Sequence, residues 1–186
     1  LQIILSHGIG RHAVALLYKA LNVSNITKQL AVKAKWDECV GEDIPLKQWE
    51  NALIYVKQVS RNARLKYTQF NYLHQTYLTP HRLHTMFPLV LAQCPRCSCE
   101  DAGFLHMVWQ CKDLRQRWEQ VMKVIMDIID VRLPITPQVC LMGLATRTKK
   151  NKASLRFADL AMVLFKRLIA KAWEAWKATT PPTLTE

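Results

Sequence analysis

Glycine is scarce in this chain, and so are the alternating apolar and polar residues that predict β-strands. Only 5 of the 186 residues are glycine, although 50% are hydrophobic. A composition this apolar argues against disorder throughout the chain. Apolar residues recur instead at intervals of three and four, which is typical of helices. We therefore expect a mainly α-helical fold with a sizeable core.

Targeting and membrane segments are lacking too. The opening LQIILSHGIG has neither the charged start nor the cleavage site of a secretory signal. No segment approaches the roughly 18 uninterrupted apolar residues of a membrane span, since even the apolar segment 157–170 contains Asp159, Lys166 and Arg167. We expect a soluble piece of a longer polypeptide, truncated at both ends and held in a reducing, intracellular compartment.

Catalytic motifs are absent from the sequence as well. The sequence has no Walker loop, no Gly-rich dinucleotide loop and no Gly-x-Ser-x-Gly elbow. Polymerases and nucleases need carboxylates that hold two metal ions close together. The string FADL supplies only Asp159, within a helical pattern, and Asp127 and Asp130 are the other candidates for a nuclease after the cysteine cluster. We expect a chain that catalyses nothing alone and takes no small-molecule substrate.

Positive charge is concentrated in two stretches. Residues 51–99 contain six basic residues and no acid, and residues 131–158 contain six more and no acid. The rest of the chain is balanced, so these stretches account for the whole net charge of +12. Clustered cations attract nucleic-acid backbones by releasing condensed counterions, and a merely solvated face is the alternative. The candidate contacts are Lys57, Arg61, Asn62, Arg64, Lys66, Arg82, Lys149, Lys150 and Lys152.

Aromatic residues are interleaved with the first basic stretch. Tyr67, Phe70, Tyr72 and Tyr77 are able either to stack on unpaired bases or to pack in the core at helical spacing. Both interpretations remain open. The neighbouring His74, His81 and His84 fit a helix surface better than a metal site.

Caps and periodicity predict a succession of helices. We expect them over residues 11–21, 26–35, 46–59, 63–77, 114–130 and 154–177. Short helices follow Thr79-Pro80 and Thr136-Pro137, where Thr serves as N-cap and Pro opens the helix. If helicity continued from 46 through 66, Lys57, Arg61 and Arg64 would share one side. The last helix is apolar nearly all round at first, which predicts burial against several neighbours.

Four cysteines and a histidine fall in the window CPRCSCEDAGFLHMVWQC. Cys94 and Cys97 have the Cys-x2-Cys spacing that turns two sulfurs toward one ion, and His106 and Cys111 complete a tetrahedral set. Cys99 is an alternative to Cys94 or Cys97, and a group of reduced buried cysteines without metal is the other interpretation. Four protein ligands leave no open position, so one structural Zn²⁺ is expected, in a small knuckle inserted between helices of an irregular bundle.

The order of these landmarks resembles a known family. The landmarks, in order, are SRNARLKYTQF through MFP, CPRC with GFLHMVWQC, WEQVMKVI, ITPQVCLMGL, and finally AKAW with PPTLTE. Together they are similar to the region after the polymerase in non-LTR retrotransposons of the long interspersed element class. The similarity covers the chain from about Trp36 onward. The ordered set is more specific than the cysteines alone.

The resemblance implies a division of the chain and a role. Residues 1–93 would continue the polymerase thumb, 94–130 would hold the zinc knuckle and the following helix, and 131–186 would form a C-terminal helical region. Cys94, Cys97, His106 and Cys111 would bind zinc. The whole would hold template RNA and target DNA, in nucleus and cytoplasm, during target-primed reverse transcription by an upstream polymerase domain that carries the catalytic aspartates.

Two other functions compete with this one. The chain could dock on the polymerase as a protein-interaction module through Trp173, Trp176 and the apolar last helix. It could also be a metal-dependent nuclease tail, for which acids would have to converge.

Overall fold

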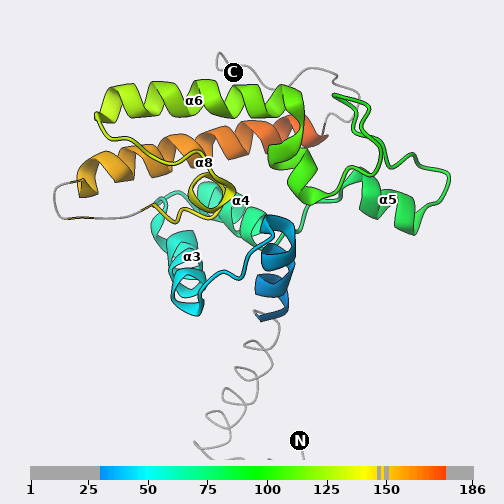
Figure 1. Cartoon of the computed structure of the whole chain (residues 1–186), viewed down its shortest axis with the longest axis horizontal. Helices are drawn as coiled ribbons and strands as arrows, with labels where there is room; N and C mark the ends of the chain where they lie inside the picture. Colours follow the sequence, from blue (N-terminus) through cyan, green and yellow to red (C-terminus); the bar gives the residue numbers. More distant parts are fainter. Residues whose placement is uncertain (1–29, 146–147, 149–150, 175–186) are drawn as a thin grey trace, which may run out of the picture. The chain divides into compact units, whose positions relative to one another are not determined.

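A computed structural model describes residues 30–145, 148 and 151–174 (Figure 1). The chain divides into two compact units, Leu1–Pro45 and Leu46–Glu186. Every regular element in the described stretches is helical, which confirms the mainly α fold class. The helix expected over residues 11–21 lies outside the described residues.

The described part of the first unit is a helix over residues 30–40 and the loop after it. The helix expected over 26–35 therefore extends further than its sequence pattern indicated. It ends at Gly41, whose φ of +78° is the left-handed conformation that stops helices without steric cost to glycine. Lys33, which is buried, donates to Asp37 at 2.7 Å and to Asp43 at 2.5 Å, and so ties the helix to the loop.

The second unit opens with two helices that a short break separates. α3 spans Leu46–Gln58 and α4 spans Ala63–Leu73. Ser60 Oγ accepts from the backbone N–H of Asn62, and Asn62 Oδ1 accepts from that of Arg64 at 2.8 Å, so both side chains satisfy donors at the start of α4. Helicity is therefore not continuous through this region. α4 ends before the expected 77, because Gln75 adopts a positive φ of 50°.

Both Thr-Pro dipeptides open helices, as predicted. α5 spans Pro80–Met86, and Thr79 accepts from the N–H of Arg82. α7 spans Pro137–Cys140, and Thr136 accepts from the N–H of Val139. In each case proline stands where its missing N–H has no helical partner to lose.

The longest helices pack against each other. α6 spans Lys112–Ile129 and α8 spans Lys152–Glu174, and they run side by side in Figure 1. α6 buries residues at intervals of three and four, and Trp118 meets Phe165 of α8 edge to face, with ring centroids 4.7 Å apart. The indole N–H of Trp118 donates to Val108 O in η1, a π-helical turn at His106–Gln110. This contact seats η1 at the start of α6.

A second group of contacts joins α3, α4 and α8. Tyr55, Val59, Leu65 and Val163 form one buried apolar cluster. Beside it, the hydroxyl of Tyr72 donates to the backbone oxygen of Lys166 at 3.0 Å. The outer face of α8 differs from the expectation, because it is not buried all round: its exposed apolar side chains are Phe157, Leu160 and Leu164. Its packing against α4 and α6 covers the opposite side.

None of the described helices combines the length and the apolar character required to cross a membrane.

Candidate metal centre

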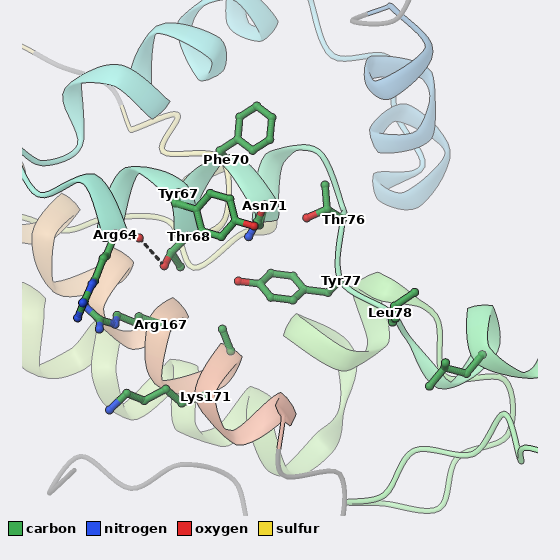
Figure 2. Close-up of a pocket in the computed structure, with 12 residues that line it drawn as sticks. Arg64, Tyr67, Thr68, Phe70, Asn71, Thr76, Tyr77, Leu78, Arg167 and Lys171 are labelled. Carbon is green, nitrogen blue, oxygen red and sulfur yellow. Dashed lines mark hydrogen bonds between the residues drawn. The ribbon is translucent and has the colours of Figure 1, made fainter.

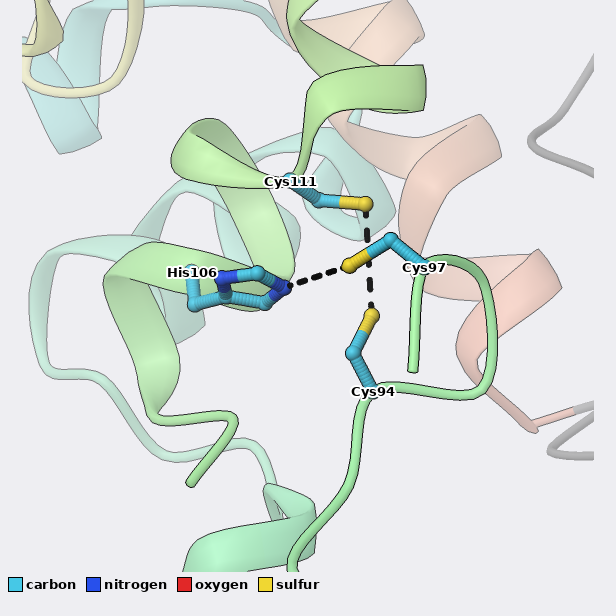
Figure 3. A group of neighbouring side chains, drawn as sticks. All are labelled: Cys94, Cys97, His106 and Cys111. Atoms are coloured by element: carbon cyan, nitrogen blue, oxygen red, sulfur yellow. Dashed lines mark hydrogen bonds between the residues drawn. The ribbon is translucent and has the colours of Figure 1, made fainter. Parts of the chain in front are cut away.

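Four side chains converge at the junction of the loop before η1, η1 itself and α6 (Figure 3). Their ligand atoms all lie within 4.8 Å of one another. Cys94 Sγ lies 3.9 Å from Cys111 Sγ, and Cys97 Sγ lies 3.3 Å from His106 Nε2. Cys94, Cys97, His106 and Cys111 are therefore close enough to hold a metal ion, as the sequence pattern predicted.

Backbone hydrogen bonds shape the turn that carries the first two sulfurs. The N–H of Ser98 donates to Cys94 O, and the N–H of Cys94 donates to Cys99 O, both at 2.9 Å. Ser98 adopts a positive φ of 56°, which closes the turn. This local fold directs Cys94 and Cys97 toward the same point, which is the geometry that the two-residue spacing allows.

Arg96 links this turn to the opposite half of the group. Its Nη1 donates to Met107 O at 2.9 Å. Met107 directly follows His106, so the guanidinium holds the turn against η1 while both sides present their ligand atoms. No sequence pattern indicated this role of Arg96, because the contact depends on the fold of residues 103–110.

The other half of the group depends on the π-turn. The N–H of Cys111 donates to His106 O at 3.0 Å, a bond that spans five residues instead of four. The extra residue per turn lets His106 and Cys111 face the same point even though they are five apart. Cys111 also immediately precedes α6, so the ligand set is attached to the start of a helix that packs against α8.

The protonation state of His106 suits a metal ligand. Partial burial, assisted by the charge of Arg96, lowers the pKa of His106, so the neutral imidazole that binds metals is favoured at neutral pH. Cys94 and Cys111 are buried, while Cys97 and His106 are partly exposed.

Two of the separations within the group are close to those of a tetrahedral metal site. With Zn–S near 2.3 Å and Zn–N near 2.0 Å, tetrahedral angles place two sulfurs about 3.8 Å apart and a sulfur about 3.5 Å from a nitrogen. The separations of 3.9 and 3.3 Å lie close to these values. Three sulfurs and one imidazole also form a donor set that is typical of structural zinc.

Cys99 lies outside the group. Its thiol is exposed and contacts Glu100 O at 3.3 Å. The three nearby histidines lie outside it too: His74 packs on Phe70, while His81 contacts Asp101 and His84 contacts Val90 O. Within the described residues no second group of His, Cys, Asp and Glu is placed to hold a metal, and Asp127, Asp130 and Asp159 form none.

A cavity of about 660 Å³, named the basic cavity, lies between α3, α4 and the start of α8. Its basic lining residues are Lys57, Arg61, Lys66, Lys152 and Arg156. Three belong to the first acid-free stretch and two to the second, so the fold brings these two stretches together. Among the described lining residues the single acid is Asp159, which is buried.

The other predicted contacts are distributed differently. Because helicity breaks between α3 and α4, Arg64 does not share a side with Lys57 and Arg61 but lines a different cavity. Asn62 caps α4, and Arg82 lies exposed on α5 and donates to Gln75 O at 3.4 Å. Lys149 and Lys150 lie outside the described residues.

Arg156 was missed as a candidate contact at the level of sequence. It follows Lys152 by four residues, so both extend from the same face of α8. This four-residue spacing within the second acid-free stretch could have identified Arg156 as a candidate contact.

No protein-family model matches the chain.

Proposed function

We propose that this chain is a zinc-stabilised nucleic-acid-binding region of a retrotransposon reverse transcriptase. It holds template RNA or target DNA for an upstream polymerase domain and leaves the chemistry to that domain. The proposal rests on the family resemblance of the sequence together with the charge and geometry of the described residues.

The basic cavity is the observation that carries the binding role. Five cations from three helices and the α3–α4 break surround one concave surface, against one buried acid among the described residues. Holding like charges together opposes folding, so their convergence favours a polyanionic ligand that offsets the repulsion. Phosphates spaced along a nucleic-acid backbone are such a ligand, and contacts to them are independent of sequence.

Zinc has a structural part in this function. It fits the four-ligand group and leaves no ligand position for substrate or water. Cys111 directly precedes α6, which packs on α8, the helix that carries Lys152 and Arg156. The ion would therefore anchor the start of α6, at the end of this helix pair opposite to those two residues (Figure 1). Its contribution is folding free energy rather than catalysis.

A binding titration tests the nucleic-acid role. We expect log Kd for an RNA or DNA oligonucleotide to rise linearly with log salt concentration. Lys57→Ala, Arg61→Ala and Lys152→Ala should each weaken binding to all sequences alike and reduce the salt slope by about one. Lys123→Ala is the matched control, since Lys123 is exposed on α6 and lines neither cavity. A slope near zero for the unaltered chain would refute the proposal.

Metal analysis tests the zinc role. Elemental analysis of the purified chain should give one zinc per molecule. Cys94→Ser, Cys97→Ser, His106→Ala and Cys111→Ser should each lose the metal, whereas Cys99→Ser should retain it. If Cys99→Ser lost the metal while Cys94→Ser or Cys97→Ser retained it, Cys99 would replace that cysteine as the ligand.

A second candidate is docking onto a protein partner such as the polymerase. The observation that favours it is the exposed apolar segment after α5, where Phe87 is 59% exposed, Leu91 71% and Leu89 fully exposed. Replacing Leu89 and Leu91 by Ser should weaken association with the polymerase domain and leave oligonucleotide affinity unchanged. Unchanged association would remove this candidate.

A further inference from the structure

A second cavity lies between α4, α8 and the segment that joins α4 to α5 (Figure 2). Its volume is about 820 Å³, and we call it the aromatic cavity. The aromatic and basic side chains that line it are Arg64, Tyr67, Phe70, Tyr77, Arg167 and Lys171. Every lining residue is either neutral or basic, among the residues that the structure describes.

The aromatic rings on α4 differ sharply in burial. Tyr72 is fully buried, and its hydroxyl donates to the backbone of α8, so it belongs to the core. Tyr67 is 66% exposed and Phe70 is 43% exposed. Core packing therefore accounts for Tyr72 and leaves a largely accessible ring at Tyr67. The ring of Phe70 packs in part on His74, with ring centroids 4.2 Å apart, and the rest of its surface is accessible.

Cations line the same cavity as these rings. In Figure 2, Arg64, Arg167 and Lys171 lie toward the left of the view, and Tyr77 lies between α4 and α8. Tyr67 lies over α4, and Phe70 extends on the other side of α4. Arg167 and Lys171 are four residues apart, so they project from the same face of α8. The cavity thus offers apolar ring faces and positive charge side by side.

We propose that the aromatic cavity binds an unpaired strand of nucleic acid, with bases stacked on Tyr67 and Phe70 and phosphates held by Arg64, Arg167 and Lys171. Exposed rings next to cations are the combination that single-strand sites use, because each base has a stacking face and each nucleotide a phosphate. A duplex keeps its bases stacked on one another and cannot offer those faces without melting. The proposal deepens the nucleic-acid-binding function and rests on it.

The decisive experiment compares strands with and without free base faces. Fluorescence anisotropy would measure Kd for three probes at one salt concentration: oligouridylate, oligothymidylate and a blunt DNA duplex. The variants are Tyr67→Ala and Phe70→Ala. Tyr67→Phe keeps the ring, and Phe157→Ala removes an aromatic of similar exposure from α8 outside the cavity.

We expect each alanine variant to weaken binding of the single strands by about 10-fold, which corresponds to one lost stacking contact. Binding of the duplex should change less than twofold, and both control variants should behave as the unaltered chain.

The failures of the two proposals are distinguishable. If the unaltered chain binds single strands but the alanine variants bind them equally well, or lose duplex and single-strand affinity alike, the aromatic cavity is not a stacking site and the general binding function stands. If the unaltered chain binds none of the three probes, both proposals are overturned. Circular dichroism of each variant establishes that the helices are retained.

Discussion

At the scale of single residues, Gly143 occupies a position that leaves no room for a side chain. Its φ is +78°, which side chains other than glycine rarely adopt. A Cβ atom built there would lie 2.4 Å from the buried ring of Tyr55. The close approach lets the segment after α7 pack directly against α3.

Gly143→Ala should therefore lower the free energy of unfolding by about 2–4 kcal/mol, from left-handed backbone strain and overpacking together. Chemical denaturation in the presence of zinc measures this. Gly103→Ala is the control, because its Cβ would meet nothing within 4 Å and its φ is ordinary. Equal stability of the two variants would contradict this explanation.

Lys166 is the most unusual buried group. It is fully buried, and its Nζ donates to Gln69 Oε1 at 2.5 Å and to Leu141 O at 3.0 Å. Burial lowers its pKa to about 7, against the opposing influence of Cys140 and Asp159, and burial raises the pKa of the Cys140 thiol to about 12. One side chain thereby joins α4, α8 and the end of α7.

This pKa predicts a pH dependence of stability. Between about pH 7 and 9 the unfolded chain binds a proton at Lys166 that the folded chain does not, so the free energy of unfolding should rise with pH, by up to about 1.4 kcal/mol per pH unit. Above about pH 9 the raised pKa of the Cys140 thiol acts in the opposite direction. Below pH 7 both states are protonated and this dependence vanishes. In Lys166→Met the rise should disappear, while Lys171→Met, an exposed lysine on the same helix, should keep it. Parallel pH profiles for all three chains would exclude the assignment.

At the scale of elements, Arg96 links the two segments that carry the proposed ligands. It lies in the turn at Cys94–Cys97 and donates to Met107 O in the π-turn η1. Arg96→Met should reduce zinc affinity about 10-fold or more, the usual effect of losing a hydrogen bond that orients a ligand-bearing segment. Competition with a chromophoric chelator gives the affinity. Lys112→Met removes an equal charge next to Cys111 from an exposed position and should have little effect.

Helix identity was more predictable from sequence than helix boundaries. The Thr-Pro starts of α5 and α7 were predictable because Thr79 and Thr136 act within a few residues. The end of α4 was not, because the chain turns at Gln75 in a left-handed conformation that no glycine marked. The π-turn was also unpredictable, since its five-residue hydrogen bond depends on seating η1 against Trp118.

At the scale of the whole molecule, the candidate sites were predictable only in part. Local spacing was sufficient to find the four residues of the metal-binding group. The charge count identified two acid-free stretches but not the surfaces they share. Arg167 and Lys171 line the aromatic cavity together with residues of α4 because α8 packs against α4. These residues are about 100 positions apart in the sequence, so no local pattern could predict that they share a surface.

Metal removal should destabilise one part of the second unit more than the rest. A zinc concentration about a thousandfold above Kd stabilises the folded state by about 4 kcal/mol. Chelation should therefore lower the denaturation midpoint and speed hydrogen exchange most at residues 94–115, which carry the ligands and the start of α6. The amides of α4, anchored by Leu65 and Tyr72, should retain more protection. Uniform loss across the unit, or no change at all, would contradict a local structural role for the ion.

Of the six cysteines, Cys99 alone is exposed. It lies two residues after Cys97, yet its sulfur points to Glu100 O and takes no part in the group of four. A thiol-specific dye should therefore label this position first, while metal and burial shield the neighbouring sulfurs. The protein thus carries a natural attachment point for a fluorophore beside the group of four, from which the response of this group to chelators can be followed.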